Sequence, residues 1–255
     1  MRVYVEFGKD TEWIFPATFR RIFEAYLHKI TTIHGDSNPY SFDGKHYVPW
    51  VFSDPQWKGK RKKEKDRLIV EGPVGVYIDS PIEIIAEDIF KHFMRGGSME
   101  ILGEKLDIYS VQAIPKYPNF ALGTLNVMAI SPIVTYKTFD NQTCFIYPFD
   151  TKQWKPMVEN SIKRKLVAFG YIPPEEAEKV DIKITPTSLD IRKNYRVASY
   201  TKEGHTMVFK GFTGLYKLEG HPKALEIAYR SGIGSRNGIG FGMLKEYQPR
   251  HKKNM

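Results

Sequence analysis

The order of strand and helix patterns in this chain of 255 residues repeats once along its length. In the first half, apolar alternation predicts strands over 2–7, 47–53, 67–79 and 99–114, and apolar stripes predict helices over 16–30 and 80–94. After a proline-containing segment at 115–120, the same order returns, with strands over 122–138, 180–191, 205–220 and 237–247 and helices over 150–170 and 221–232. A βαββαβ order is typical of a ferredoxin-like or RNA-recognition module, an antiparallel sheet with both helices on one face. We therefore predict an α+β fold of two tandem ferredoxin-like (RNA-recognition-motif-like) βαββαβ modules, over residues 1–117 and 118–255.

The charge of the chain favours a polyanionic partner. Lys and Arg number 38 against 29 Asp and Glu, a formal net charge of +9, which suits nucleic acid or an anionic membrane surface as well as it suits a basic, solvated surface. No stretch approaches the roughly 20 apolar residues of a membrane span, and the alternating N-terminus resembles neither a signal nor a transit peptide. We therefore expect a cytoplasmic protein with no membrane partner. The single cysteine, Cys144, excludes an internal disulfide and a cysteine-based zinc site.

Residues 231–245, SGIGSRNGIGFGMLK, form a glycine-rich run between the last predicted helix and the last predicted strand. A dinucleotide-binding loop would instead follow a strand and open a helix, and a phosphate loop would end in Gly-Lys-Ser or Gly-Lys-Thr. One remaining interpretation is a helix C-cap and turn that require positive φ, which would account for two or three of the five glycines. The other is a ligand loop whose missing side chains let a phosphate backbone approach the N–H groups. We favour the ligand loop, because five glycines at this spacing are costly in chain entropy.

The run over 209–245 resembles the C-terminal end of the CRISPR-associated repeat-RNA-processing endoribonucleases, which belong to a superfamily of glycine-rich-loop RNA-binding proteins. The pattern of that family is a strand, a short helix and then G-h-G-x-x-x-x-G-h-G-h-G, where h is apolar. Here Gly232-Ile233-Gly234 and Gly238-Ile239-Gly240-Phe241-Gly242 fill the pattern, with three residues between the two blocks in place of four. Residues 131–137 and 160–171 resemble the family's first strand of the second module and the helix that follows it. The order of the two modules extends the resemblance over the whole chain.

The resemblance implies an enzyme that cuts precursor CRISPR RNA within each repeat, without a metal or another cofactor, to give mature guide RNAs. The nucleophile is the 2′-OH next to the scissile phosphate, and the products are a 2′,3′-cyclic phosphate and a 5′-OH. Histidine suits the proton transfers because its pKa lies near neutrality. The family's histidine usually follows the first helix, where this chain offers His34, His46 and His28, in that order of preference. Each of them has an alternative role as a surface or structural histidine.

The other predicted site residues follow from the same resemblance and from charge. Tyr26 would orient the nucleophile, unless it packs in the core, and Lys45 would stabilise the charge of the transition state. The cationic run 58–67 would form an arm along the RNA backbone. The predicted RNA-binding residues are glycines, polar residues and cations of the second half: Gly232, Gly234, Ser235, Arg236, Asn237, Gly238, Gly240, Gly242, Lys245, Lys163, Arg164, Arg192, Lys193 and Arg196.

Two alternatives to this enzyme stay open. One is a non-catalytic RNA-binding subunit of a CRISPR ribonucleoprotein complex, with the same fold and the same glycine loop. The other is a ferredoxin-like enzyme that acts on a small phosphorylated metabolite. Under both RNA hypotheses the expected partners are CRISPR repeat RNA and other subunits of a CRISPR effector complex, and the protein itself is expected to be a monomer or a homodimer.

Overall fold

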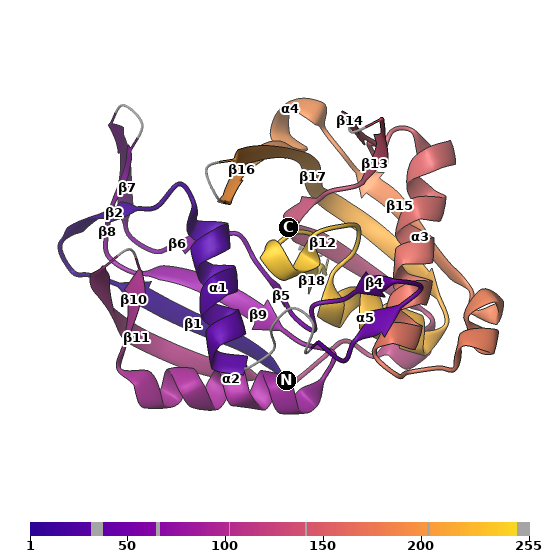
Figure 1. Ribbon diagram of the computed structural model, residues 1–255, viewed down its shortest axis with the longest axis horizontal. Helices are drawn as coiled ribbons and strands as arrows, with labels where there is room; N and C mark the ends of the chain where they lie inside the picture. Colours follow the sequence, from indigo (N-terminus) through magenta and orange to yellow (C-terminus); the bar gives the residue numbers. More distant parts are fainter. Residues whose placement is uncertain (32–37, 65–66, 102, 141, 203–204, 249–255) are drawn as a thin grey trace, which may run out of the picture.

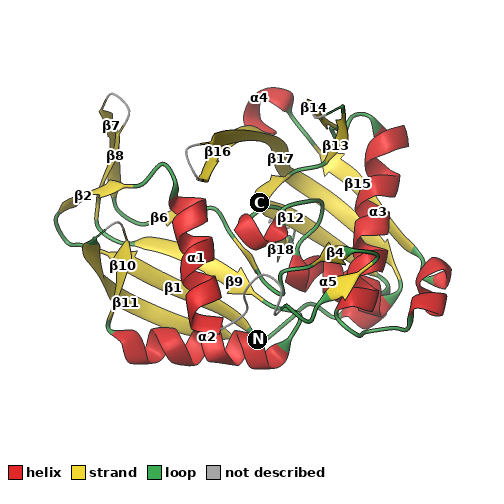
Figure 2. Ribbon diagram, in the orientation of Figure 1, coloured by secondary structure: helices red, strands yellow, loops and turns green. Residues whose placement is uncertain are grey.

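The computed structural model describes residues 1–31, 38–64, 67–101, 103–140, 142–202 and 205–248. Two antiparallel sheets lie side by side, one built from the first half of the chain and the other from the second half (Figure 1). Each sheet has its own helices and its own large buried core (Figure 2). Within the described residues, no helix is long and apolar enough to cross a membrane.

The first sheet has the strand order β10–β11–β1–β9–β5. Its strands are β1 (Arg2–Gly8), β5 (Val51–Phe52), β9 (Val74–Asp79), β10 (Ser98–Ile101) and β11 (Glu104–Ile114), and β6 (Gln56–Trp57) also pairs with β9. Helices α1 (Phe19–Thr31) and α2 (Glu83–Gly96) pack on this sheet. Because successive strand residues point to opposite faces, Val3, Val5 and Phe7 of β1 all reach the core that contains Phe23 of α1 and Ile89 of α2.

The second sheet has the strand order β15–β17–β12–β18. Its strands are β12 (Thr124–Ile133), β15 (Ile182–Ser188), β17 (His205–Gly220) and β18 (Leu244–Glu246), and β16 (Tyr195–Lys202) pairs with the first part of β17. Helices α3 (Thr151–Ala168) and α5 (Pro222–Ser231) pack on it, and short helical turns are η2 (Phe120–Leu122), η3 (Pro174–Lys179), α4 (Ile191–Asn194) and η4 (Asn237–Ile239). The core joins Val127 of β12 to Val158 of α3 and Ile227 of α5.

The predicted architecture of two tandem βαββαβ modules is confirmed. In each sheet the first and third strands of the motif lie in the centre, and the two motif helices pack against the same core. The first sheet ends with β11 at Ile114 and the second begins with β12 at Thr124. The predicted boundary between residues 117 and 118 falls between these strands, and it stays a prediction.

Local details depart from the predicted pattern where glycine or proline interrupts a strand. The single strand expected over 67–79 is wrong: β8 (Arg67–Glu71) pairs with β2 (Glu12–Phe15) and β7 (Lys60–Glu64), whereas β9 belongs to the main sheet. Gly72 has φ +96° and Pro73 follows it, so the chain turns between the two strands. Only Leu244–Glu246 of the strand expected over 237–247 is extended, because η4 and its glycines precede it.

Buried charges hold the two modules against each other. Arg2 Nε of β1 donates to Asp79 Oδ2 of β9 at 2.8 Å, and Arg230 of α5 approaches the other oxygen of Asp79 with its Nε at 3.7 Å. Tyr117, in the connection between the modules, donates to Asp79 Oδ1 at 2.8 Å. Arg230 Nη2 also pairs with Glu83 at the start of α2, at 2.8 Å. Ionic groups buried in this way are costly unless each keeps its partners, so this cluster favours one relative position of the two modules.

Candidate active site

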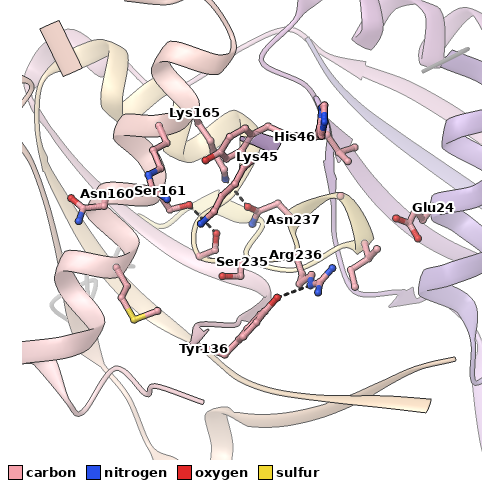
Figure 3. Close-up of a pocket in the computed structure, with 17 residues that line it drawn as sticks. Glu24, Lys45, His46, Tyr136, Asn160, Ser161, Lys165, Ser235, Arg236 and Asn237 are labelled. Atoms are coloured by element: carbon pink, nitrogen blue, oxygen red, sulfur yellow. Dashed lines mark hydrogen bonds between the residues drawn. The ribbon is translucent and has the colours of Figure 1, made fainter. Parts of the chain in front are cut away.

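A cavity of about 700 Å³ opens between the two modules. Its walls come from α1, from a small hairpin of the first module, from α3 and from the glycine-rich run (Figure 3). The lining is rich in cations, and Glu24 is its single carboxylate among the described residues. The basic lining side chains are Lys45, His46, Arg164, Lys165 and Arg236. A concave basic site of this kind suits a phosphate-bearing ligand.

The hairpin that carries Lys45 and His46 belongs to the first module but docks on the second. Its strands are β3 (Ser41–Phe42) and β4 (Lys45–His46), in a segment expected to be a loop. The rings of Tyr40 and Tyr47 pack against Phe169 at the end of α3, with centroid distances of 5.5 and 6.4 Å. This docking places the exposed residues Lys45 and His46 at the edge of the cavity.

Packing inside the protein accounts for every glycine of the glycine-rich run. Gly232, Gly234, Gly240 and Gly242 have φ between +75° and +83°, a region that favours glycine. An added Cβ would lie 1.9 Å from Ile233 O at Gly242 and 2.2 Å from a ring carbon of Phe52 at Gly240. At Gly238, which has an ordinary φ, the Cβ would meet the Val48 side chain at 2.7 Å. The expectation that structural needs explain only two or three glycines is therefore wrong.

Both modules hold the glycine-rich run by its carbonyl oxygens. From the first module, Arg20 of α1 donates to Ile239 O at 3.3 Å and also to Gly240 O, and Trp50 Nε1 donates to Gly238 O at 3.2 Å. From the second module, Ser161 Oγ of α3 donates to Gly234 O at 3.1 Å. The part of the run that faces the cavity is residues 234–239. Gly232, Gly240 and Gly242 are buried and do not line it.

Arg236 projects from the exposed tip of the run. It adopts φ +62°, which is uncommon for a residue with a side chain. Its Nε donates to Tyr136 Oη at 2.9 Å, and its guanidinium lies 5.9 Å from the Phe209 ring centroid. These contacts keep the cation over the cavity that Ser235 and Asn237 also line (Figure 3).

Lys165 lines the cavity but is absent from the predicted RNA-binding residues, although it belongs to the same cationic stretch as Lys163 and Arg164. It lies on the buried stripe of α3, three residues after Ile162 and seven after Val158, and only 4% of its side chain is exposed. Burial lowers its pKa to about 7, because the charged form loses hydration. The sequence signal was a lysine in phase with the apolar stripe, a place where lysine is rare.

Two of the predicted residues, Tyr26 and His28, do not line the cavity. Tyr26 Oη contacts His92 Nε2 of α2 at 2.9 Å and does not line the cavity, so this position gives no support to its role in orienting a nucleophile. Burial raises the pKa of Tyr26 and lowers that of His92. His28 packs edge-on against Trp50, with 4.8 Å between the ring centroids, and does not line the cavity. His34 lies outside the described residues.

Several predicted cations also lie away from the cavity. Lys163 donates to Glu178 O near η3 at 3.3 Å, and Lys245 lies 5.3 Å from the Tyr77 ring centroid in a separate cavity of about 210 Å³. Arg192 and Lys193 are exposed on α4, and Arg196 Nη1 donates to Lys193 O at 2.6 Å. Of the predicted cations of the second half, Arg164 and Arg236 are the ones that line the cavity.

The cationic run 58–67 includes strand β7 and the first residue of strand β8. Strands β7 and β8 pair antiparallel and project from the first module (Figure 1). Residues Lys60–Glu64 are all exposed, and Lys62 pairs with Glu64 beside it. Across the part of the chain that the structure describes, no three His, Cys, Asp or Glu side chains gather as metal ligands would.

Sequence comparison identifies relatives over the whole chain. The model of the family described as CRISPR associated protein Cas6, C-terminal, matches residues 115–246, slightly more than half of the chain. The protein named CRISPR-associated endoribonuclease Cas6 1 of Methanocaldococcus jannaschii is 22% identical over 264 residues, which cover 100% of this chain and 96% of that protein. The protein named CRISPR-associated endoribonuclease Cas6 of Pyrococcus furiosus is 22% identical over 173 residues, which cover 66% of this chain but only 59% of that protein.

The fold has a similar solved structure. A structure described as an RAMP protein binding different RNA substrates matches with a TM-score of 0.71 at 20% sequence identity, over 97% of this chain and 100% of that one. At this identity the match speaks for the fold, and it agrees with the tandem ferredoxin-like architecture. The chain belongs to the Cas6 family of CRISPR-associated proteins, two members of which are named endoribonucleases above.

Proposed function

We propose that this protein is a metal-independent endoribonuclease that cleaves CRISPR repeat RNA to produce mature guide RNAs. The observation that carries the proposal is the joint cavity, which is lined by His46 and Lys45 of the first module and by Arg236 at the tip of the glycine-rich run. The family membership and the endoribonuclease names of the two relatives support the same activity.

The chemistry needs few groups, because RNA carries its own nucleophile. The 2′-OH attacks the adjacent phosphorus, the P–O5′ bond breaks, and the products are a 2′,3′-cyclic phosphate and a 5′-OH. We assign proton transfer to His46, the histidine that lines the cavity among the described residues. His34 stays a candidate for the same role on sequence grounds. We assign stabilisation of the negative phosphorane to Lys45 and Arg236, two cations that line the same cavity.

The repeat RNA is proposed to lie over the cavity with its backbone on Arg164, Arg236 and residues 236–238 of the loop. The Ser235 N–H is not part of this surface, because it donates to Val134 O at 2.7 Å. The solved structure described as an RAMP protein binding different RNA substrates supports RNA as the ligand class. Other CRISPR effector subunits are proposed as further partners of the product complex.

The deciding experiment incubates the protein with labelled CRISPR repeat RNA in excess EDTA, beside the same RNA with a single 2′-deoxy nucleotide at the cut site. We expect a cut in EDTA that the 2′-deoxy substitution blocks, and product ends that carry a cyclic phosphate. Tight binding of both RNAs with no cut in any buffer would contradict the proposal and make the chain a non-catalytic RNA-binding subunit.

A further inference from the structure

The Lys165 ammonium group lies where α3 meets the glycine-rich run. Its Nζ donates to Gly232 O at 2.7 Å, to Asn237 Oδ1 at 2.5 Å and to Ser231 O at 3.3 Å. The two carbonyl groups are at the C-terminal end of α5, where a positive charge is favourable for the helix dipole. The three hydrogens of the ammonium group therefore have three acceptors.

Asn237 extends this contact to both sides of the run. Its Nδ2 donates to Ile233 O at 3.1 Å and to Phe241 O at 2.8 Å, while its Oδ1 accepts from Lys165 (Figure 3). The side chain is buried, so each of these hydrogen bonds is shielded from water. One amide and one ammonium group thus close the segment 231–241 into a fixed loop, and residues 234–239 of that loop line the cavity.

We propose that Lys165 is a positioning residue that fixes the cavity-facing loop through Ser231, Gly232 and Asn237, and that the grip of this loop on RNA depends on the proton that Lys165 carries. The inference rests on the proposed function, because its main readout is RNA binding. Lys165 acts through Asn237 and the loop backbone and need not touch the RNA itself.

The proton dependence follows from the surroundings of Lys165. Among the described residues, its acceptors are two carbonyl oxygens and one amide oxygen, and none is a carboxylate. The charged groups that line the same cavity are Lys45 and His46 on β4, Arg164 on α3, Arg236 on the loop and Glu24 on α1. With burial lowering its pKa to about 7, Lys165 loses its charge and one of its donors as the pH rises above neutrality. A polyanion in the cavity favours the protonated form, so RNA binding and proton binding support each other.

The test compares the wild-type chain with Lys165→Met, which has a similar length and no charge. Lys152→Met is the matched control, because Lys152 is exposed in the first turn of the same helix and does not line the cavity. Affinity for the 2′-deoxy repeat RNA is measured from pH 6 to pH 9 at constant salt. At pH 6 we expect Lys165→Met to bind about tenfold more weakly than wild type, a loss of the size of one charge-assisted hydrogen bond. At pH 9 we expect the difference between the two affinities to narrow without vanishing, because the neutral amine keeps two of its three donors, and we expect Lys152→Met to follow wild type throughout.

A loss of affinity that is the same at every pH would overturn the proposal, because it would mean that the effect of Lys165 on RNA binding does not depend on its proton. Amide hydrogen exchange of residues 232–243 without RNA gives an independent readout: Lys165→Met should lose protection there and keep it in β1 and β9. If wild type binds no repeat RNA, the proposed function fails. The hydrogen-exchange comparison still tests whether Lys165 fixes the loop. If Lys165→Met does not fold, NMR titration of the Lys165 Nζ in the wild-type chain decides, and titration above pH 10 would contradict the proposal.

Discussion

The two modules share one topology but differ in the segment between their second long helix and the last strand of the βαββαβ motif. In the first module, Gly96 and Gly97 lead from α2 into the edge hairpin β10–β11. In the second module, the same place holds the glycine-rich run between α5 and β18. Gly97 has φ +58°, and a Cβ added there would meet no atom within 4 Å. Gly242 has φ +75°, and a Cβ added there would lie 1.9 Å from Ile233 O. Glycine can thus be required for its positive φ alone, as at Gly97, or also because neighbouring atoms leave no room for a Cβ, as at Gly242.

The first helices of the two modules show a matching contrast. Helix α1 buries Phe19, Phe23 and Leu27, an apolar stripe that suits a hydrophobic core. Helix α3 has an equivalent stripe but includes Lys165 in it, at the level of the glycine-rich run. In the second module, a lysine that hydrogen-bonds to the glycine-rich run thus occupies a position where an apolar side chain would be expected. Such departures from the apolar pattern are expected near functional sites.

The largest expected effect tests the contrast between the two sets of glycines. We expect Gly242→Ala to lower the free energy of unfolding by about 4 to 5 kcal/mol, from overpacking and positive φ together. Gly97→Ala should cost less, about 1 to 3 kcal/mol, since its backbone conformation (φ +58°, ψ −31°) is its only penalty. Chemical denaturation of both variants provides the comparison. Equal losses would mean that the packing around Gly242 relaxes and that the two segments do not differ in this respect.

The next prediction separates the contributions of the modules to the proposed reaction. His46→Ala should lower the cleavage rate about 10²- to 10⁴-fold, the range for loss of a general acid or base, while affinity for the 2′-deoxy RNA is kept. Single-turnover cleavage and equilibrium binding measure the two quantities. His221→Asn is the control, because His221 caps α5 in the other module and asparagine retains that role. An unchanged rate in His46→Ala would direct attention to His34.

The pH dependence of stability sharpens the contrast between α1 and α3. The pKa of Lys165 is about 7 in the folded protein, below the 10.5 expected when it is solvated. The unfolded state then binds more protons between these values, so the free energy of unfolding should rise with pH from about 7 towards 10. Lys165→Met should lack this contribution. Melting temperatures of both proteins across that range would show it, and parallel curves would contradict it.

The smallest expected effect concerns the docking of the β3–β4 hairpin on α3. Asp43 pairs with Arg164 at 3.2 Å, but 62% of the Asp43 side chain and 38% of the Arg164 side chain are exposed to solvent. We expect Asp43→Asn to cost no more than about 1 kcal/mol, whereas Phe169→Ala should cost about 3 kcal/mol because two tyrosine rings lose their packing partner. Thermal unfolding of the two variants ranks these contributions. The reverse ranking would mean that charge rather than ring packing holds the hairpin.

Periodic patterns made most of the fold predictable. Residues 205–220 were expected as a strand and form β17 with the same bounds, and the helices were placed to within a few residues, because apolar residues recur there with a clear period. The β3–β4 hairpin was not predicted, since it is too short to show a period and is held by rings from the other module.

The candidate site was predictable in part. His46 and Lys45, predicted as catalytic residues, and Arg164 and Arg236, predicted as RNA-binding residues, line one cavity, and their roles stay predictions. The charges of Arg192, Lys193 and Lys245 gave no information about the direction in which they would point, and these residues lie elsewhere. The steric need for the glycines also depends on contacts that only the folded chain makes, such as that of Gly238 with Val48.

The hold of the first module on the glycine-rich run has a consequence for how the protein folds. Arg20 and Ile239 are 219 residues apart in sequence, and Trp50 and Gly238 are 188 apart. Contacts of such long sequence separation form late, because the chain between them must first be organised. During synthesis, the segment with the donors Arg20 and Trp50 leaves the ribosome before residues 238–240, whose carbonyl oxygens are the acceptors, have been added. The cavity proposed to bind RNA is thus completed at the end of folding, so a chain that stops before residue 238 should lack a complete cavity.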